Sequence, residues 1–203
     1  DEPLGALDKN LRYEMQVEIK EIQRRLGMTV VYVTHDQEEA MNMSDRIAIM
    51  NSGRIEQVGP PTAIYERPSS IFAARFLGEA NLIEGILESV VGGIASVRIE
   101  GGAVLRAETS GQPRSGGLVS VFFRPERVGI GGSGAGNEMS STNRLQGKVT
   151  QTSFLGNILR YAVDIGNGQR VLVDLQNSRG DPVQGVREVA LSWRVSDSLV
   201  LDH

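Results

Sequence analysis

Glycine is distributed unevenly along this 203-residue chain, and no other feature constrains the possible fold as strongly. Residues 1–80 hold 5 of the 24 glycines, whereas residues 81–203 hold the other 19. In the second part, glycine-rich turns separate short apolar runs every ~8–12 residues, which is typical of a small β-barrel or sandwich. The first part carries helical and buried-strand patterns instead. We therefore expect an α/β part over residues 1–80 and an all-β part over residues 81–203.

A long helix and a buried strand are predicted near the start of the chain. Five apolar residues recur at spacings of three and four, the period of one helix face: Leu11, Met15, Ile19, Ile22 and Leu26. Asp8 is suited to cap this helix and Gly27 to end it, so the helix is predicted over residues 9–26. Residues 29–33 (Thr-Val-Val-Tyr-Val) are apolar without alternation, which predicts a parallel strand covered on both faces.

Further elements are predicted after the strand. Asp36 is expected to cap a second helix, with Glu39 as its reciprocal partner in a capping box. An Asn-Ser-Gly turn predicts a β-hairpin over residues 47–58. Prolines bracket a short helix between 60 and 68, and residues 70–77 are predicted to form another. Together these elements resemble the end of an α/β unit.

The all-β part contains a weak internal repeat. Asn-Leu-Ile-Glu-Gly at 81–85 resembles Asn-Arg-Leu-Gln-Gly at 143–147. This similarity predicts two half-units, residues 81–130 and residues 143–201. The segment 129–143 consists mostly of Gly, Ser, Ala, Thr and Asn, and it is predicted to be a flexible loop.

Composition excludes several classes of function. The chain carries 21 basic and 25 acidic residues, a net charge of −4, whereas a nucleic-acid-binding domain shows a basic excess. The absence of cysteine excludes disulfides and cysteine-ligated zinc, and two histidines leave no His-rich metal site. Apolar runs are far below the ~18 residues of a membrane span, and no signal peptide is visible. Because the first residue is Asp1 rather than methionine, we expect a piece of a longer protein.

The first eight residues, Asp-Glu-Pro-Leu-Gly-Ala-Leu-Asp, are the most informative for chemistry. Two adjacent carboxylates, Asp1 and Glu2, suit phosphoryl transfer, because one can hold Mg²⁺ or its waters while the other activates an attacking water. Taken alone, such a pair is most often solvated surface charge. A lone histidine after a strand, such as His35, is likewise most often structural.

In combination, these residues resemble the ATPase subunits of ABC transporters. In that family, Asp-Glu-Pro-x-x-x-Leu-Asp is followed further along the chain by an apolar strand and Thr-His-Asp, as in this sequence. The resemblance implies that Asp1 binds Mg²⁺ through water and that Glu2 is the catalytic base. It also implies that Asp8 lies in the D-loop facing a second subunit, and that His35 is the switch histidine that senses the γ-phosphate.

Motifs that grip the nucleotide are absent from this sequence. There is no Gly-x-x-x-x-Gly-Lys-Ser/Thr loop, whose amides and lysine hold phosphates, and no Leu-Ser-Gly-Gly-Gln signature of the family. The resemblance implies that the complete subunit is an ATPase that uses ATP and Mg²⁺. This chain alone is expected to bind neither tightly and to be inactive.

The resemblance continues through the rest of the chain. Residues 53–61 resemble the end of an importer-type ATPase domain, and residues 122–126 and 191–193 resemble its transport-associated OB-like (TOBE) domain. The resemblance therefore implies an α/β fragment, the end of a P-loop ATPase domain, followed by an all-β OB-like regulatory and dimerising domain. Phe-Leu-Gly-Asn at 154–157 looks most like importers of polyamines.

Partners and a location are also implied by the resemblance. A second ATPase subunit would form a homodimer with this one, and membrane permease subunits would hold it at the cytoplasmic face of the plasma membrane. A solute-binding protein would act indirectly, and no nucleic acid is expected. The alternative is a stand-alone OB-like module that binds a small ligand, with residues 1–80 as the remnant of an ATPase.

Overall fold

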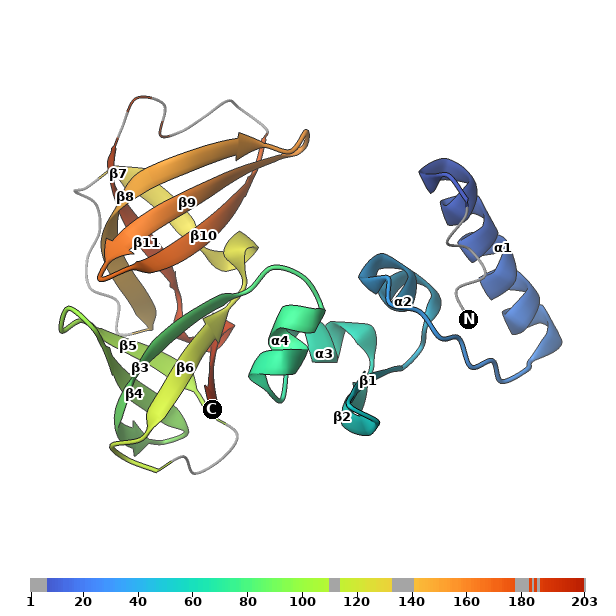
Figure 1. Ribbon diagram of the computed structural model, residues 1–203, viewed down its shortest axis with the longest axis horizontal. Helices are drawn as coiled ribbons and strands as arrows, with labels where there is room; N and C mark the ends of the chain where they lie inside the picture. Colours follow the sequence, from blue (N-terminus) through green and yellow to red (C-terminus); the bar gives the residue numbers. More distant parts are fainter. Residues whose placement is uncertain are drawn as a thin grey trace. The chain divides into compact units, whose positions relative to one another are not determined.

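The chain divides into two compact units, Asp1–Gly78 and Glu79–His203. The computed structural model describes the following residues of these units: 7–109, 114–132, 141–177, 183, 185 and 187–202. The division falls two residues before the boundary expected between residues 80 and 81. In Figure 1 the first unit runs from blue to teal and the second from green to red.

The helix α1 (Lys9–Leu26) has the bounds predicted from the apolar stripe. Asp8 caps it, because its side chain accepts hydrogen bonds from two backbone N–H groups of the first turn at 3.1 and 3.0 Å. Gly27 ends it with a φ of 63°, a left-handed conformation that glycine adopts without steric cost. Part of the apolar face remains open to solvent in the described structure, since Leu11 is 42% and Leu26 62% exposed.

Residues 29–33 do not form the predicted strand. Val31 is 87% and Val33 is 60% exposed, and the segment has no strand pairing. A central parallel strand needs neighbours that take up its backbone hydrogen bonds on both edges. Among the described residues of the first unit, the only sheet is a two-stranded hairpin further along the chain. The prediction is therefore wrong for this chain, because an apolar sequence does not by itself supply the partner strands.

The remaining elements of the first unit confirm the predictions. They are α2 (Gln37–Met43), β1 (Ile47–Asn51), β2 (Arg54–Gly59), α3 (Pro61–Glu66) and α4 (Ile71–Phe76). The strands β1 and β2 pair antiparallel across the Asn-Ser-Gly turn. A small apolar core joins the hairpin to the two last helices: Ile47, Ile49, Ile64, Ala73 and Leu77.

The second unit is all β in its described part, apart from two 3₁₀ turns, as predicted. Its strands are β3 (Asn81–Val91), β4 (Ile94–Ile99), β5 (Val104–Glu108), β6 (Leu118–Phe123), β7 (Gly129–Gly132), β8 (Thr142–Phe154), β9 (Ile158–Gly166), β10 (Gln169–Gln176), β11 (Glu188–Arg194) and β12 (Ser198–Asp202). The turns η1 (Pro125–Arg127) and η2 (Val195–Asp197) follow β6 and β11.

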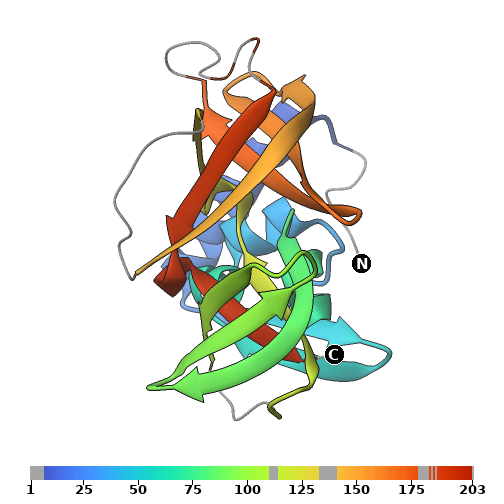
Figure 2. The ribbon, with the colours of Figure 1, turned by 90° about the vertical axis from the view of Figure 1, so that its left-hand side faces the viewer.

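These strands form a closed barrel and a five-stranded sheet. The barrel has the order β12-β5-β4-β3-β6, and the sheet has the order β10-β9-β8-β11-β7. Four strands of the barrel, β3 to β6, come from the first half of the unit, whereas its fifth strand, β12, comes from the second half. Four strands of the sheet, β8 to β11, come from the second half, whereas its fifth strand, β7, comes from the first half. Figure 2 shows the exchanged strand β12, in red, among the green strands of the barrel. Because of this exchange, the segments 81–130 and 143–201 do not form separate bodies.

Both ends of the loop that is predicted over residues 129–143 are strand in the structure. Gly129–Gly132 forms β7, which pairs antiparallel with β11, and β8 begins at Thr142. A glycine-rich segment can take this edge position because pairing with β11 satisfies its backbone groups. Residues 133–140 lie outside the described residues.

Two asparagines at equivalent places link the two halves of this unit. The Asn81 amide donates to the backbone oxygen of Leu172 at 2.9 Å and accepts from its N–H at 2.7 Å. Asn143 makes the same pair of bonds with Arg106, at 2.7 and 2.8 Å. Both asparagines are buried, so solvent does not compete for these bonds. Each asparagine near the start of a long strand thus fastens that strand to the opposite half.

Candidate functional site

Only part of the expected ATPase site lies among the described residues. Asp1 and Glu2 fall outside them. Asp8 lies at the N-terminus of α1, where it serves as the helix cap. His35 lies in the turn that precedes α2, and its side chain is exposed. The structure therefore shows the start of α1, where Asp8 is expected to face the second subunit. It also shows the turn that carries His35, which is expected to sense the nucleotide.

A cleft of about 700 Å³ runs between α1 and the start of α2, and His35 lines it. Arg12 and Glu14 of α1 lie on its wall, together with Asp36 and Glu38 beside the histidine. The three carboxylates outnumber the one guanidinium, so this lining does not favour a phosphate by charge. A phosphate bound beside His35 would need most of its hydrogen-bond donors from residues outside this cleft.

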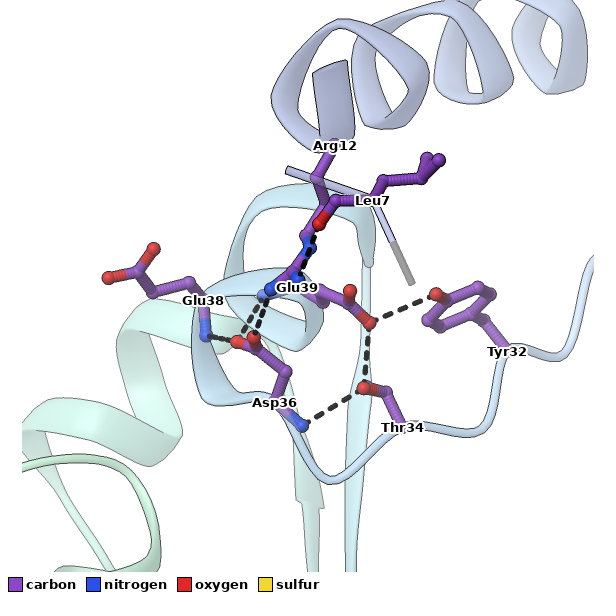
Figure 3. A network of polar contacts seen from close by, with 7 residues as sticks. All are labelled: Leu7, Arg12, Tyr32, Thr34, Asp36, Glu38 and Glu39. Atoms are coloured by element: carbon purple, nitrogen blue, oxygen red, sulfur yellow. Dashed lines mark hydrogen bonds and ion pairs between the residues drawn. The ribbon is translucent and has the colours of Figure 1, made fainter. Parts of the chain in front are cut away.

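Behind the histidine, Glu39 places a buried carboxylate in α2, only 3% exposed. Its Oε2 accepts a hydrogen bond from the Thr34 hydroxyl at 2.7 Å and another from the Tyr32 hydroxyl at 2.9 Å (Figure 3). The Thr34 oxygen accepts in turn from the backbone N–H of Asp36 at 2.9 Å. These bonds hold the segment on both sides of His35 against the helix.

The cap of α2 differs from the prediction in one respect. Asp36 accepts hydrogen bonds from the backbone N–H groups of Glu38 and Glu39 at 2.8 and 3.2 Å, as a capping residue should. In a capping box, the Glu39 carboxylate would accept from the N–H of Asp36. That N–H instead donates to the Thr34 hydroxyl, while Oε2 of Glu39 accepts from the hydroxyl groups of Thr34 and Tyr32.

Arg12 connects the start of α1 to the histidine turn. Its Nη2 donates to the backbone oxygen of Leu7 at 2.9 Å, and its Nη1 lies 3.4 Å from Oδ2 of Asp36. Both charged side chains are partly exposed, so the ion pair itself contributes modestly to stability. Its value is geometric: it joins the segment that carries Asp8 to the turn that carries His35.

The Tyr32 hydroxyl remains a donor across the physiological pH range. Burial, followed by the hydrogen bond to the negatively charged Glu39, raises the pKa of Tyr32 to about 12. The bond between the two residues therefore keeps one direction, from hydroxyl to carboxylate.

Sequence reasoning missed the supporting roles of Tyr32, Thr34 and Arg12. A signal was available: the two hydroxyl residues stand two positions apart, hence on one side of an extended segment, and an acidic residue follows in the next helix. Among the residues that the structure describes, no group of acidic or histidine side chains could hold a metal ion. No described helix is long and apolar enough to cross a membrane.

Comparison with known proteins shows which proteins this chain is similar to. A TOBE domain model matches residues 121–201. The chain is 39% identical over 204 residues to the spermidine/putrescine import ATP-binding protein PotA of Rubrobacter xylanophilus and 42% identical over 209 residues to that of Thermobifida fusca. It is 38% identical over 214 residues to the putrescine transport ATP-binding protein PotG of Escherichia coli. Each match covers 99% of this chain and 52%, 52% and 54% of the relative, respectively.

A solved structure of similar fold is the cytoplasmic molybdate-binding protein ModG with molybdate bound. It matches with a TM-score of 0.52 and 16% identity, covering 61% of this chain and 96% of ModG. At this identity the likeness supports only the fold, and it agrees with an OB-like second unit. The chain spans about half the length of the curated relatives it matches, and those matches include residues 1–80 as well as the β unit. Over nearly its whole length the chain is similar to part of these import ATP-binding proteins, and its residues 121–201 match the TOBE domain.

Proposed function

We propose that this chain is part of the ATP-hydrolysing subunit of an ABC importer that takes up polyamines. The observation that carries the proposal is the 38–42% identity to spermidine/putrescine and putrescine import ATP-binding proteins over 99% of the chain. In the alternative, a stand-alone ligand-binding module, residues 1–80 would be a remnant with no function to preserve their similarity to ATPases. Since the similarity also includes the first unit, the importer subunit is the better explanation.

Four residues are proposed to act on the nucleotide or at the subunit contact. Asp1 would hold Mg²⁺ through water, and Glu2 would accept the proton of the attacking water. His35 would donate a charge-assisted hydrogen bond to the γ-phosphate, a role that its exposure on the cleft permits. Asp8 would face the second subunit. Bound Mg-ATP supplies the phosphoryl group and the charge that these residues recognise.

Partners and location follow from the same proposal. Two copies of the ATPase subunit would pair, with residues 81–203 as the dimerising element. Permease subunits would hold the pair at the cytoplasmic face of the membrane, and a solute-binding protein would deliver the polyamine to the permease. The lack of a membrane-spanning helix among the described residues is compatible with a peripheral subunit.

The proposed role of Glu2 can be tested in a full-length subunit that contains this chain. We expect Glu2→Gln to keep Mg-ATP binding while hydrolysis falls about 100-fold, the usual scale for a lost general base. The control is Glu18→Gln, a change of the same kind on the exposed surface of α1, which should hydrolyse normally. Hydrolysis at the wild-type rate by Glu2→Gln would show that the base is another residue.

A further inference from the structure

Thr34 occupies a special position beside the proposed switch histidine. Its hydroxyl donates to the buried Glu39 at 2.7 Å and accepts from the N–H of Asp36 at 2.9 Å (Figure 3). One bond anchors the residue before His35, and the other anchors the residue after it. His35 therefore lies at the centre of a turn, and Oγ1 of Thr34 makes the hydrogen bonds that hold both ends of that turn.

These two bonds matter because, among the described residues, no strand pairs with the segment before the turn. Residues 29–33 make no strand pairing in the described structure, so strand hydrogen bonds do not fix their course. The buried Glu39 carboxylate instead binds the segment through two hydroxyl groups, those of Tyr32 and Thr34. Hydrogen bonds in such a buried network are stronger than in water and restrain the groups that they join.

We propose that Thr34, anchored by Glu39, is a positioning residue for His35. It does not touch the nucleotide, and it acts by holding the backbone of the turn so that the imidazole keeps one orientation in the cleft. A hydrogen bond to a phosphate oxygen requires placement within about 0.5 Å, which a loosely held turn does not provide. This inference rests on the proposed role of His35 for its effect on hydrolysis, but its effect on the histidine itself can be measured separately.

Thr34→Val is the sharpest perturbation. Valine keeps the branched shape of threonine but lacks the hydroxyl, so both bonds are lost without a cavity. Thr34→Ser keeps a hydroxyl at this position and should therefore preserve the position of His35. The matched control is Thr29→Val, the same chemical change at an exposed residue of the same segment. Circular dichroism spectra of all three variants establish that the helices remain folded.

The first measurement uses the 203-residue chain labelled with ¹⁵N-histidine. The sequence contains only two histidines, so the spectrum is simple to assign, with His203 as an internal reference. We expect Thr34→Val to shift and broaden the His35 ring signals, whereas Thr34→Ser and Thr29→Val leave them in place. An unchanged His35 signal in folded Thr34→Val would overturn the positioning role, whatever the outcome of any ATPase assay.

The second measurement uses the full-length subunit and ATP hydrolysis. We expect Thr34→Val to lower kcat about tenfold with little change in KM, the effect of about one lost hydrogen bond on the barrier. In a His35→Ala background the same change should lower kcat no further. A full additional loss in that background would contradict the inference, since Thr34 would then act independently of the histidine. Normal hydrolysis by His35→Ala alone would instead refute the proposed role of His35, and the ring signals would still decide whether Thr34 positions it.

Discussion

Two glycines at equivalent places in the β unit leave no room for a side chain. A Cβ atom on Gly85 would lie 2.7 Å from the backbone oxygen of Arg98 and 2.7 Å from a methyl group of Val97. On Gly147 it would lie 2.6 Å from the oxygen of Asp164 and 2.6 Å from a methyl group of Val163. Ordinary van der Waals contact begins at 3.4 Å, so two neighbours would have to move away by about 0.7 Å at Gly85 and by about 0.8 Å at Gly147.

Those neighbours cannot retreat cheaply. Both valines are fully buried, and both carbonyl groups belong to strands paired with the glycine strand. Overpacking of a core costs about 1–3 kcal/mol, and a backbone obstacle puts these sites at the upper end. We therefore predict that Gly85→Ala and Gly147→Ala each lower the free energy of unfolding by about 3 kcal/mol. For a unit of this size, that corresponds to a fall in Tm of roughly 10 °C.

The single tryptophan gives a direct assay. Trp193 is 3% exposed and stacks on Phe123 with ring centroids 4.3 Å apart, so its fluorescence reports unfolding of the β unit. Urea titrations of both variants should show earlier midpoints. The control is Gly131→Ala, where an added Cβ meets nothing within 4 Å and stability should change by less than about 0.5 kcal/mol. A loss below 1 kcal/mol in both test variants, or an equal loss in the control, would refute the packing argument.

Two further predictions concern the link between the halves and the nucleotide. Asn143→Ala removes two buried hydrogen bonds to the backbone of Arg106 and should destabilise the β unit by about 2–3 kcal/mol, measured by the same fluorescence titration; an unaltered midpoint would show that the bonds add nothing. The 203-residue chain should not bind Mg-ATP with micromolar affinity, because its sequence has no phosphate-binding loop and carboxylates outnumber cations among the charged residues that line the cleft beside His35. Calorimetric titration tests this, and a micromolar dissociation constant would be the contrary result.

Features set by short-range signals were predictable from the sequence. The helix α1 combines an apolar stripe, a capping aspartate and a terminal glycine within a single stretch of chain, and each signal acts locally. The hairpin β1–β2 depends in the same way on its own turn. Asp36 was predictable as a cap because capping requires only a side chain two or three residues from the N–H groups it accepts.

Features that depend on distant partners were not predictable in this way. The valines of residues 29–33 have the composition of a buried strand, but a strand exists only where another strand pairs with it. Glu39 matched a local capping pattern, yet its carboxylate accepts from the hydroxyl groups of Tyr32 and Thr34, and the Asp36 N–H donates to Thr34. The exchange of β7 and β12 likewise depends on which edges the other strands leave unpaired, and the sequence repeat carries no sign of it.

Transport itself provides the most direct test of the proposed function. In a bacterial strain that lacks its spermidine/putrescine import ATP-binding protein, a chimeric subunit would carry this chain in place of the matching half of that protein. Uptake of radiolabelled putrescine is then measured in energised cells. We predict that the chimera restores uptake and that Glu2→Gln within it abolishes uptake while the complex still assembles. An assembled chimera that hydrolyses ATP without importing putrescine, or uptake unaffected by Glu2→Gln, would contradict the proposed function.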